Sequence, residues 1–271
     1  MSQHMMKSAL QRFTTLLTPL LCTLASCALL SCGEAGQSRV SVPLYASGVE
    51  LSEPIEARGG VTLTLTRAEL AFGALYLCAG VSAGDLCESA RLEWLDSAVI
   101  DTLDPTPRTL GTLTGVSGSV RSWMYDLGLS SQLTAEEPFV LEASEELGGY
   151  SFILEGVAEL DGARASFSAR VKIQQSDDTE LGVPVIRKSS AERFEHEVDA
   201  EESGLLLKFD PRPWLSGLDL NSYLSGVACE EVPCEPSELT FEITSPSEAH
   251  RALRIALLTR GRPTFTWGYT P

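Results

Sequence analysis

The chain has 271 residues, of which 44% are hydrophobic and 21% are charged, and this balance is typical of a globular protein rather than a disordered one. Its formal net charge is -17, from 20 basic and 37 acidic residues. So acidic a chain lacks the excess of lysine and arginine with which proteins bind nucleic-acid phosphates, and anionic lipid headgroups repel it. We therefore expect no nucleic-acid partner, and any attachment to a membrane has to be covalent or apolar.

The amino terminus has the layout of a secretory signal peptide. Residues 1–12 contain Lys7 and Arg12 as their only charges, and residues 13–30 contain none, so a positive segment precedes an apolar one. The alternative is an uncleaved helical anchor, because an apolar run of this length approaches the minimum that spans a bilayer. Four threonines and Pro19 interrupt the apolar run, and we therefore favour a cleaved leader.

Two tetrapeptides near the end of the leader finish in cysteine, Leu-Ala-Ser-Cys at Cys27 and Leu-Leu-Ser-Cys at Cys32. Both resemble the lipobox of bacterial lipoproteins. That resemblance implies cleavage before the cysteine and attachment of a diacylglyceryl group, with palmitate, to its thiol. Cleavage at Cys27 would leave an apolar start to the mature chain, whereas Gly33 and Glu34 follow Cys32. We therefore prefer Cys32 as the lipidated residue and keep Cys27 as the alternative.

These assignments divide the chain into a signal peptide (1–31), a lipidated tether (32–38) and one folded domain (39–271). Cleavage removes two lysine or arginine residues and no acid, so the mature chain has 18 basic and 37 acidic residues and a net charge of -19. The tether reaches at most ~25 Å, so we expect the domain close to the membrane. The resemblance further implies that Gly33, rather than aspartate, after the cysteine is compatible with sorting to an outer membrane. The expected location is the cell envelope.

Four further cysteines lie in the mature part: Cys78, Cys87, Cys229 and Cys234. An even number of cysteines in an exported chain indicates disulfides, and three pairings are possible. The two local pairings, Cys78 with Cys87 and Cys229 with Cys234, are preferred because each closes a short loop. A four-cysteine zinc site is the alternative, but the spacings lack the tight pairs typical of such sites.

Strand patterns dominate the mature chain. Residues 61–66 alternate apolar and hydroxyl side chains, and the alternation then shifts by one residue, which predicts a bulge near Arg67. Other runs of the same kind predict a series of further short strands at residues 40–45, 92–100, 109–116, 120–127, 139–141, 194–198, 205–209, 239–243 and 264–269.

The clearest predicted element is a β-hairpin of residues 152–160 and 163–173. Asp161-Gly162 between them is a dipeptide that tolerates the positive φ of a two-residue turn. Placing Leu160 opposite Ala163 sets the register and puts the apolar side chains of both strands on one face. In that register the facing pairs are Ala158 with Ala165, Gly156 with Phe167, Leu154 with Ala169 and Phe152 with Val171.

Helical signals are few. Ser245-Pro246 and the following residues predict an N-cap, a proline at the first position and about three turns ending near Gly261. Residues 214–223 predict a short helix or turn. Many short strands with one short C-terminal helix predict an all-β fold, a β-sandwich of mainly antiparallel strands.

Common catalytic and nucleotide-binding motifs are absent, and we expect no enzyme activity and no cofactor. A Ser-His-Asp arrangement of residues distant in the sequence is not excluded by this absence. His196 with Glu195 and Glu197 is a weak candidate for metal binding. On a strand, however, His196 points to one face and both glutamates point to the other, so the sequence predicts no metal site. His250 is expected to be solvated on the C-terminal helix.

The segment Asp210-Pro211-Arg212-Pro213-Trp214-Leu215, with Asp219-Leu220 after it, faintly resembles periplasmic copper-binding β-sandwich proteins associated with methanobactin operons. The resemblance covers about a dozen residues and implies a sandwich. It implies no copper site, because the histidines and additional cysteines of that family are missing here. From the residues themselves we expect Asp210 to cap a short helix. Trp214 and the other three tryptophans are expected in the core rather than on a sugar-binding surface.

The sequence thus predicts a lipid-anchored envelope protein that acts as a non-enzymatic binding or structural module. A periplasmic protein that binds copper or another cation is the alternative, and a hydrolase without a recognisable motif is a third class. The expected partner is the membrane, through the lipid anchor, and the sequence identifies no protein or small-molecule partner.

Overall fold

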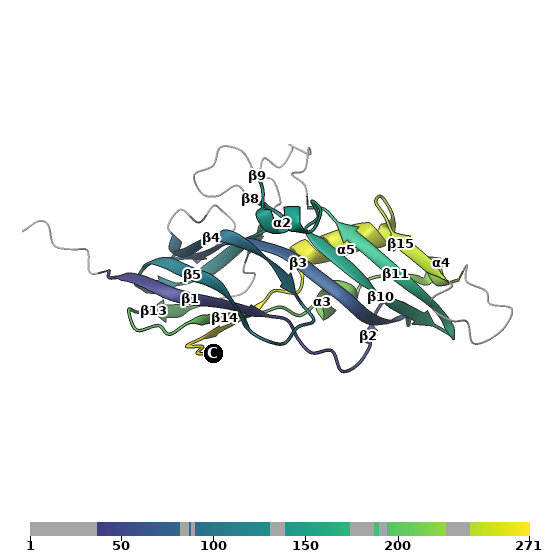
Figure 1. Cartoon of the computed structure of the whole chain (residues 1–271), viewed down its shortest axis with the longest axis horizontal. Helices are drawn as coiled ribbons and strands as arrows, with labels where there is room; N and C mark the ends of the chain where they lie inside the picture. Colours follow the sequence, from purple (N-terminus) through teal and green to yellow (C-terminus); the bar gives the residue numbers. More distant parts are fainter. Residues whose placement is uncertain are drawn as a thin grey trace, which may run out of the picture. The chain divides into compact units, whose positions relative to one another are not determined.

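Short runs of alternating apolar residues become strands throughout the folded part of the chain (Figure 1). The computed structural model describes residues 37–81, 87, 90–130, 139–173, 187–189, 194–225 and 239–271. The strands are β1 (Arg39–Ser47), β2 (Ile55–Glu56), β3 (Thr62–Cys78), β4 (Ala90–Asp101), β5 (Arg108–Val116), β6 (Gly118–Val120), β7 (Ser122–Leu127), β8 (Leu129–Ser130), β9 (Phe139–Val140), β10 (Phe152–Leu160), β11 (Ala163–Val171), β12 (Arg187–Ser189), β13 (His196–Val198), β14 (Leu205–Lys208), β15 (Thr240–Ile243) and β16 (Thr264–Trp267).

Twelve of the described strands form one mixed sheet. Its main order is β15-β11-β10-β3-β4-β5-β1-β14-β16, and β2, β7 and β12 are attached beside this path. Strand β1 pairs with β14 in parallel and β11 pairs with β15 in parallel. The other ladders described within this sheet are antiparallel. The prediction of a mainly antiparallel, all-β fold is therefore confirmed.

The hairpin of β10 and β11 has the predicted register, with Leu160 opposite Ala163 and Gly156 opposite Phe167. A Cβ atom built on Gly156 would lie 3.1 Å from Cε1 of Phe167. The aromatic ring therefore covers the glycine, an arrangement known to stabilise strand pairs. Both turn residues have positive φ, 50° at Asp161 and 86° at Gly162. The turn dipeptide thus explains why the hairpin could be located from sequence.

Replacing Gly162 with alanine is expected to lower the free energy of unfolding by about 1–2 kcal/mol, the cost of left-handed backbone for a residue with a Cβ. No atom lies within 4 Å of a Cβ added at Gly162, so the change in unfolding free energy comes from backbone conformation and not from a steric clash. Urea unfolding measures the change. Asp161→Asn is the matched control and should leave stability unchanged, since asparagine tolerates this region. Equal stability of Gly162→Ala and the wild type would contradict this account.

Strand β3 connects several parts of the sheet, since its two halves pair with different strands. Its first half pairs with β10, and its second half lies between β4 and β7. The ladder with β10 passes from Arg67 to Leu65 and skips Thr66, which confirms the predicted bulge. Nearly every side chain after the bulge is buried, because apolar groups cover both faces there.

Two different segments pack against the face of β3 that lies away from the main core. Helix α2 (Glu142–Glu146) and the residue after it bring Ala143 and Leu147 against Ala71. Further along, Met124 and the disulfide between Cys78 and Cys87 complete a second small cluster with Ala74 and Tyr76 of β3. Packing on both faces thus extends the core beyond the single apolar face that alternation alone predicts.

On its main core face the sheet curls, so that strands distant in the ladder order face each other. Phe72 of β3 contacts Phe209, which follows β14, with ring centroids 5.3 Å apart. Trp123 of β7 contacts Phe265 of β16 at 5.0 Å. Strands β4, β5 and β1 lie between β3 and β14 in the ladder order. This half of the structure is therefore sandwich-like, as predicted.

Helices cover the same face over β10 and β11. They are α3 (Arg212–Leu215), α4 (Asn221–Leu224) and α5 (Glu248–Thr259). Trp214 of α3 packs edge-on against Phe152 of β10 at 5.4 Å. The long helix α5 buries Leu253 and Leu257, because they recur at helical spacing on one side. Figure 1 shows α5 running beside these strands.

Several predicted boundaries need correction. Residues 120–127 were expected to be one strand, but β6 and β7 are separate strands that pair with different partners. The N-cap of α5 is Ser247, whose side chain accepts the backbone N–H of His250 at 3.2 Å, and not Ser245. The peptide bond between Ser245 and Pro246 is cis, so Pro246 precedes the helix instead of opening it. None of the helices in the described part of the chain is long and apolar enough to cross a membrane.

Candidate functional site

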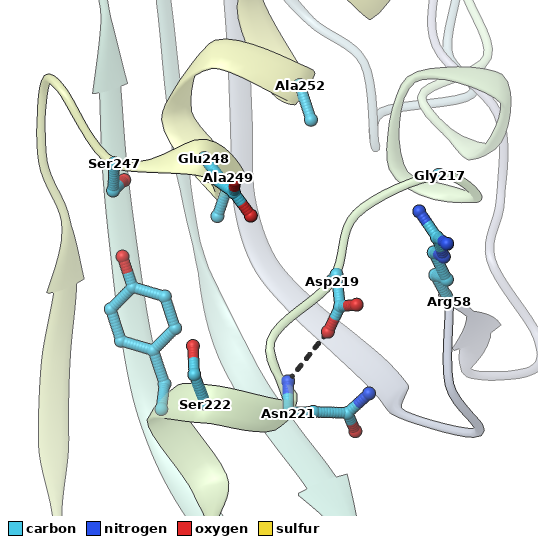
Figure 2. A pocket seen from close by; sticks show the side chains of 10 residues that line it. Arg58, Gly217, Asp219, Asn221, Ser222, Ser247, Glu248, Ala249 and Ala252 are labelled. Carbon is cyan, nitrogen blue, oxygen red and sulfur yellow. Dashed lines mark hydrogen bonds between the residues drawn. The ribbon is translucent and has the colours of Figure 1, made fainter.

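A polar pocket of about 540 Å³ lies beside the start of α5 (Figure 2). Its volume is within the range typical of small-molecule sites. Three segments far apart in the sequence form its walls: the turn after β2, the α3–α4 connection with α4, and the first turns of α5. The lining residues in the described part of the chain are Arg58, Gly217, Asp219, Asn221, Ser222, Tyr223, Ser247, Glu248, Ala249 and Ala252.

Backbone pairing holds the segment that carries Arg58 against the segment that carries Asp219. Arg58 forms an isolated parallel bridge with Asp219, and its N–H donates to the Leu218 carbonyl at 3.1 Å. Gly59 then turns the chain with φ +79°, and a Cβ atom there would lie 2.1 Å from Nδ2 of Asn221. Only glycine combines this conformation with so close an approach. The position of the Arg58 side chain at the pocket therefore follows from the local backbone.

The opposite walls come from α4 and α5. Asp219 accepts the backbone N–H of Asn221 at 3.1 Å, which holds its carboxylate at the start of α4. On α5, the Ser247 cap sets the first turn, and Glu248 is the acidic residue of that turn. Figure 2 shows Glu248 and Ala252 approaching the hollow from α5, and Arg58 approaching it from another segment.

One cation and two carboxylates thus share the pocket wall, with hydroxyl and amide groups between them. Among the described residues, Arg58 has no ion pair with Asp219 or with Glu248. No histidine or cysteine is among the described residues that line the pocket. The arrangement offers hydrogen-bond donors and acceptors for a polar ligand.

The structure places His196 away from this pocket, on β13. Burial alternates along the strand as predicted, with Glu195 and Glu197 exposed and His196 half-buried. Nε2 of His196 lies 2.9 Å from a carboxylate oxygen of Glu202, and its ring stacks on Trp267 with centroids 4.0 Å apart. The imidazole therefore meets a carboxylate from the following turn and neither of its neighbours in the sequence.

A cation at His196 would have to displace this contact with Glu202. The second carboxylate oxygen of Glu202 also accepts the backbone N–H of Gly268 at 2.9 Å. In the described parts of the chain, no three residues of the histidine, cysteine, aspartate and glutamate types are grouped as a metal site.

Several other residues considered in the sequence analysis make contacts within the fold and lie outside the pocket. His250 has Nε2 3.2 Å from the Arg170 carbonyl oxygen, so it is less solvated than expected. The N-cap of α3 is Pro211 and not Asp210, although Asp210 accepts the backbone N–H of Arg212 at 2.9 Å at the start of that helix. Trp214 is buried, as are two other tryptophans, whereas Trp267 is half-buried against His196.

Cys78 and Cys87 form a disulfide, which confirms one of the two preferred pairings. Cys27, Cys32, Cys229 and Cys234 lie outside the described residues.

One buried hydroxyl group, that of Tyr125, is held in its neutral form. The Tyr125 hydroxyl is buried without a hydrogen-bond partner. Burial raises the pKa of Tyr125, and the positive charge of Arg262 opposes this only in part. The phenol therefore stays protonated and neutral at physiological pH.

The pocket was not predicted from sequence because its residues belong to three distant segments without a motif. The available signals were local ones, the Gly59-Gly60 turn and the serine before α5. In comparisons with known proteins, no family model, no curated protein and no solved structure matches the chain.

Proposed function

We propose that this protein is a lipid-anchored component of the cell envelope, and that its folded domain binds a small polar ligand in the pocket beside α5. The pocket carries the binding part of the proposal, because charged and hydrogen-bonding side chains from three segments converge on one hollow of about 540 Å³. The leader and its lipobox-like cysteines support the envelope part. The disulfide between Cys78 and Cys87 is consistent with an oxidising compartment.

Among the described residues that line the pocket, no hydroxyl group is hydrogen-bonded to a carboxylate that could act as its base, and this favours binding over covalent chemistry. The ligand is then held in place without being converted, and the lipid keeps the domain near the membrane. Attachment through the lipid is apolar and needs no contact between basic residues and headgroups, a contact that a mature chain with a net charge of -19 does not favour.

Incorporation of a palmitate analogue tests the anchor. Expressed in a bacterial host, the full chain is expected to be labelled and to sediment with membranes at high salt. Cys32→Ser should abolish the label and release the protein from the membrane fraction.

Cys27→Ser is the matched control and should leave labelling unchanged. Loss of label in Cys27→Ser alone would move the modified residue to the alternative position. A wild-type chain that remains unlabelled, with its leader intact, would refute the envelope assignment.

A further inference from the structure

Unpaired opposite charges are the unusual feature of the pocket beside α5. The guanidinium of Arg58 and the carboxylates of Asp219 and Glu248 all line it, yet none of the ion pairs in the described part of the chain joins Arg58 to either acid. All three residues are exposed in this structure. Water therefore solvates these charges until a ligand displaces it.

A bound ligand has to replace this water for each charge, because a charge that is covered without a partner costs several kcal/mol. A neutral ligand would satisfy neither sign fully. A simple anion would pair with Arg58 but would face two carboxylates in a strongly acidic protein. A simple cation would pair with the acids and leave the guanidinium covered.

Building on the binding function proposed above, we infer that the pocket takes a small zwitterion, an amino acid or short peptide with free amino and carboxyl groups. Arg58 pairs with the ligand carboxylate, a geometry in which a guanidinium donates two parallel hydrogen bonds. The ammonium group pairs with Asp219 or Glu248. Each ligand charge then meets a wall residue of the opposite charge. Only one of the two wall carboxylates remains without a partner.

The other lining groups suit a peptide. Asn221, Ser222 and Ser247 provide amide and hydroxyl groups for the ligand's own N–H and carbonyl groups. Ala249, Ala252 and the ring of Tyr223 contribute apolar surface to the wall. Tyr223 is held by stacking on Phe241 with ring centroids 4.8 Å apart, so it offers a fixed surface to a small side chain.

Isothermal titration of the full chain with L-alanyl-L-alanine at low salt tests the inference. The free dipeptide is expected to bind at least tenfold more tightly than its N-acetyl form or its C-terminal amide, since each analogue lacks one charge. Ala252→Phe should abolish binding, because it places a ring in the hollow from the wall of α5.

Charge-matched variants assign each ligand group to its residue. In Arg58→Gln, the free dipeptide and its amide should bind equally. In Asp219→Asn combined with Glu248→Gln, the free and N-acetyl forms should bind equally. Arg254→Gln on the exposed face of α5 and Glu242→Gln on β15 lie outside the pocket and should retain the full preference for both charges.

The contrary outcomes separate the ligand class from the proposed function. Binding of maltose but not of the dipeptide, blocked by Ala252→Phe, would retain a binding pocket and overturn the zwitterion. Equal affinity for the dipeptide and both analogues would overturn it too. If neither probe binds, both the zwitterion and the pocket function are refuted, whereas the lipid anchor is tested independently by palmitate labelling.

Discussion

Replacing Trp214 with alanine is expected to lower the free energy of unfolding by about 3–5 kcal/mol, the range for truncating a buried aromatic side chain. Trp214 is 1% exposed and packs against Phe152 of β10. Its Nε1 also donates to the carbonyl oxygens of Arg260 and Gly261, each at 3.0 Å. Truncation therefore leaves a cavity and removes a link between α3 and the end of α5.

Urea unfolding of the full chain, followed by far-UV circular dichroism, measures this change. Trp214→Phe is the matched variant, because it keeps an aromatic ring and removes only the indole N–H. It should cost less than the alanine variant by at least 1 kcal/mol, since filling most of the cavity restores most of the packing. A loss below about 1 kcal/mol in Trp214→Ala would show that α3 contributes little to the core.

The same tryptophan connects the fold to the pocket. Helix α3 leads into the connection that carries Gly217 and Asp219, and α5 carries Glu248 on the other wall. A Cβ atom on Gly261 would lie 2.2 Å from Nε1 of Trp214, so the indole and this turn fit closely. The pocket is therefore supported at the end of α5 distant from its lining residues, and Trp214→Ala should weaken ligand binding as well as stability.

Local signals explain which parts of this structure were predictable. The β10–β11 register followed from one turn dipeptide and from alternation, because a slip of one residue would expose every apolar side chain. The hydrogen bond from the N–H of Arg212 to Asp210 likewise depends only on the backbone two residues away. In such cases the residues that interact are neighbours in the sequence or share one simple period.

Long-range packing explains what was missed. Alternation on β3 predicted one apolar face, whereas on the other face Ala71 packs against α2 and Tyr76 packs with the cysteines of the disulfide. The direction of His196 was correct, but its partner Glu202 arrives through a turn in which Asp199 accepts the N–H of Glu201. No pattern within one segment encodes either contact.

Removal of the disulfide is expected to cost about 2–3 kcal/mol of unfolding free energy, from the chain-entropy model for a short loop. Cys78 and Cys87 are separated by 9 positions in the sequence, and both are buried, 2% and 4% exposed, in the cluster with Met124 and Tyr76. The bond thus restricts the unfolded chain and also packs against the outer face of β3. The test variant replaces both cysteines with alanine, which avoids burying a hydroxyl group without a partner.

Urea unfolding with and without reductant separates these two contributions. Reductant breaks the cross-link and should therefore lower the unfolding midpoint of the wild type. It should leave the midpoint of the double alanine variant unchanged, because that variant has no cross-link. Any further loss in the alanine variant, relative to reduced wild type, reports the packing of the two sulfur atoms against Tyr76 and Met124. This cluster lies on the face of β3 opposite the one where Phe72 packs against Phe209. The loss of stability should therefore not change the affinity of the pocket beside α5 for its ligand. Equal stability of the oxidised wild type and the double variant would contradict a stabilising effect of the cross-link.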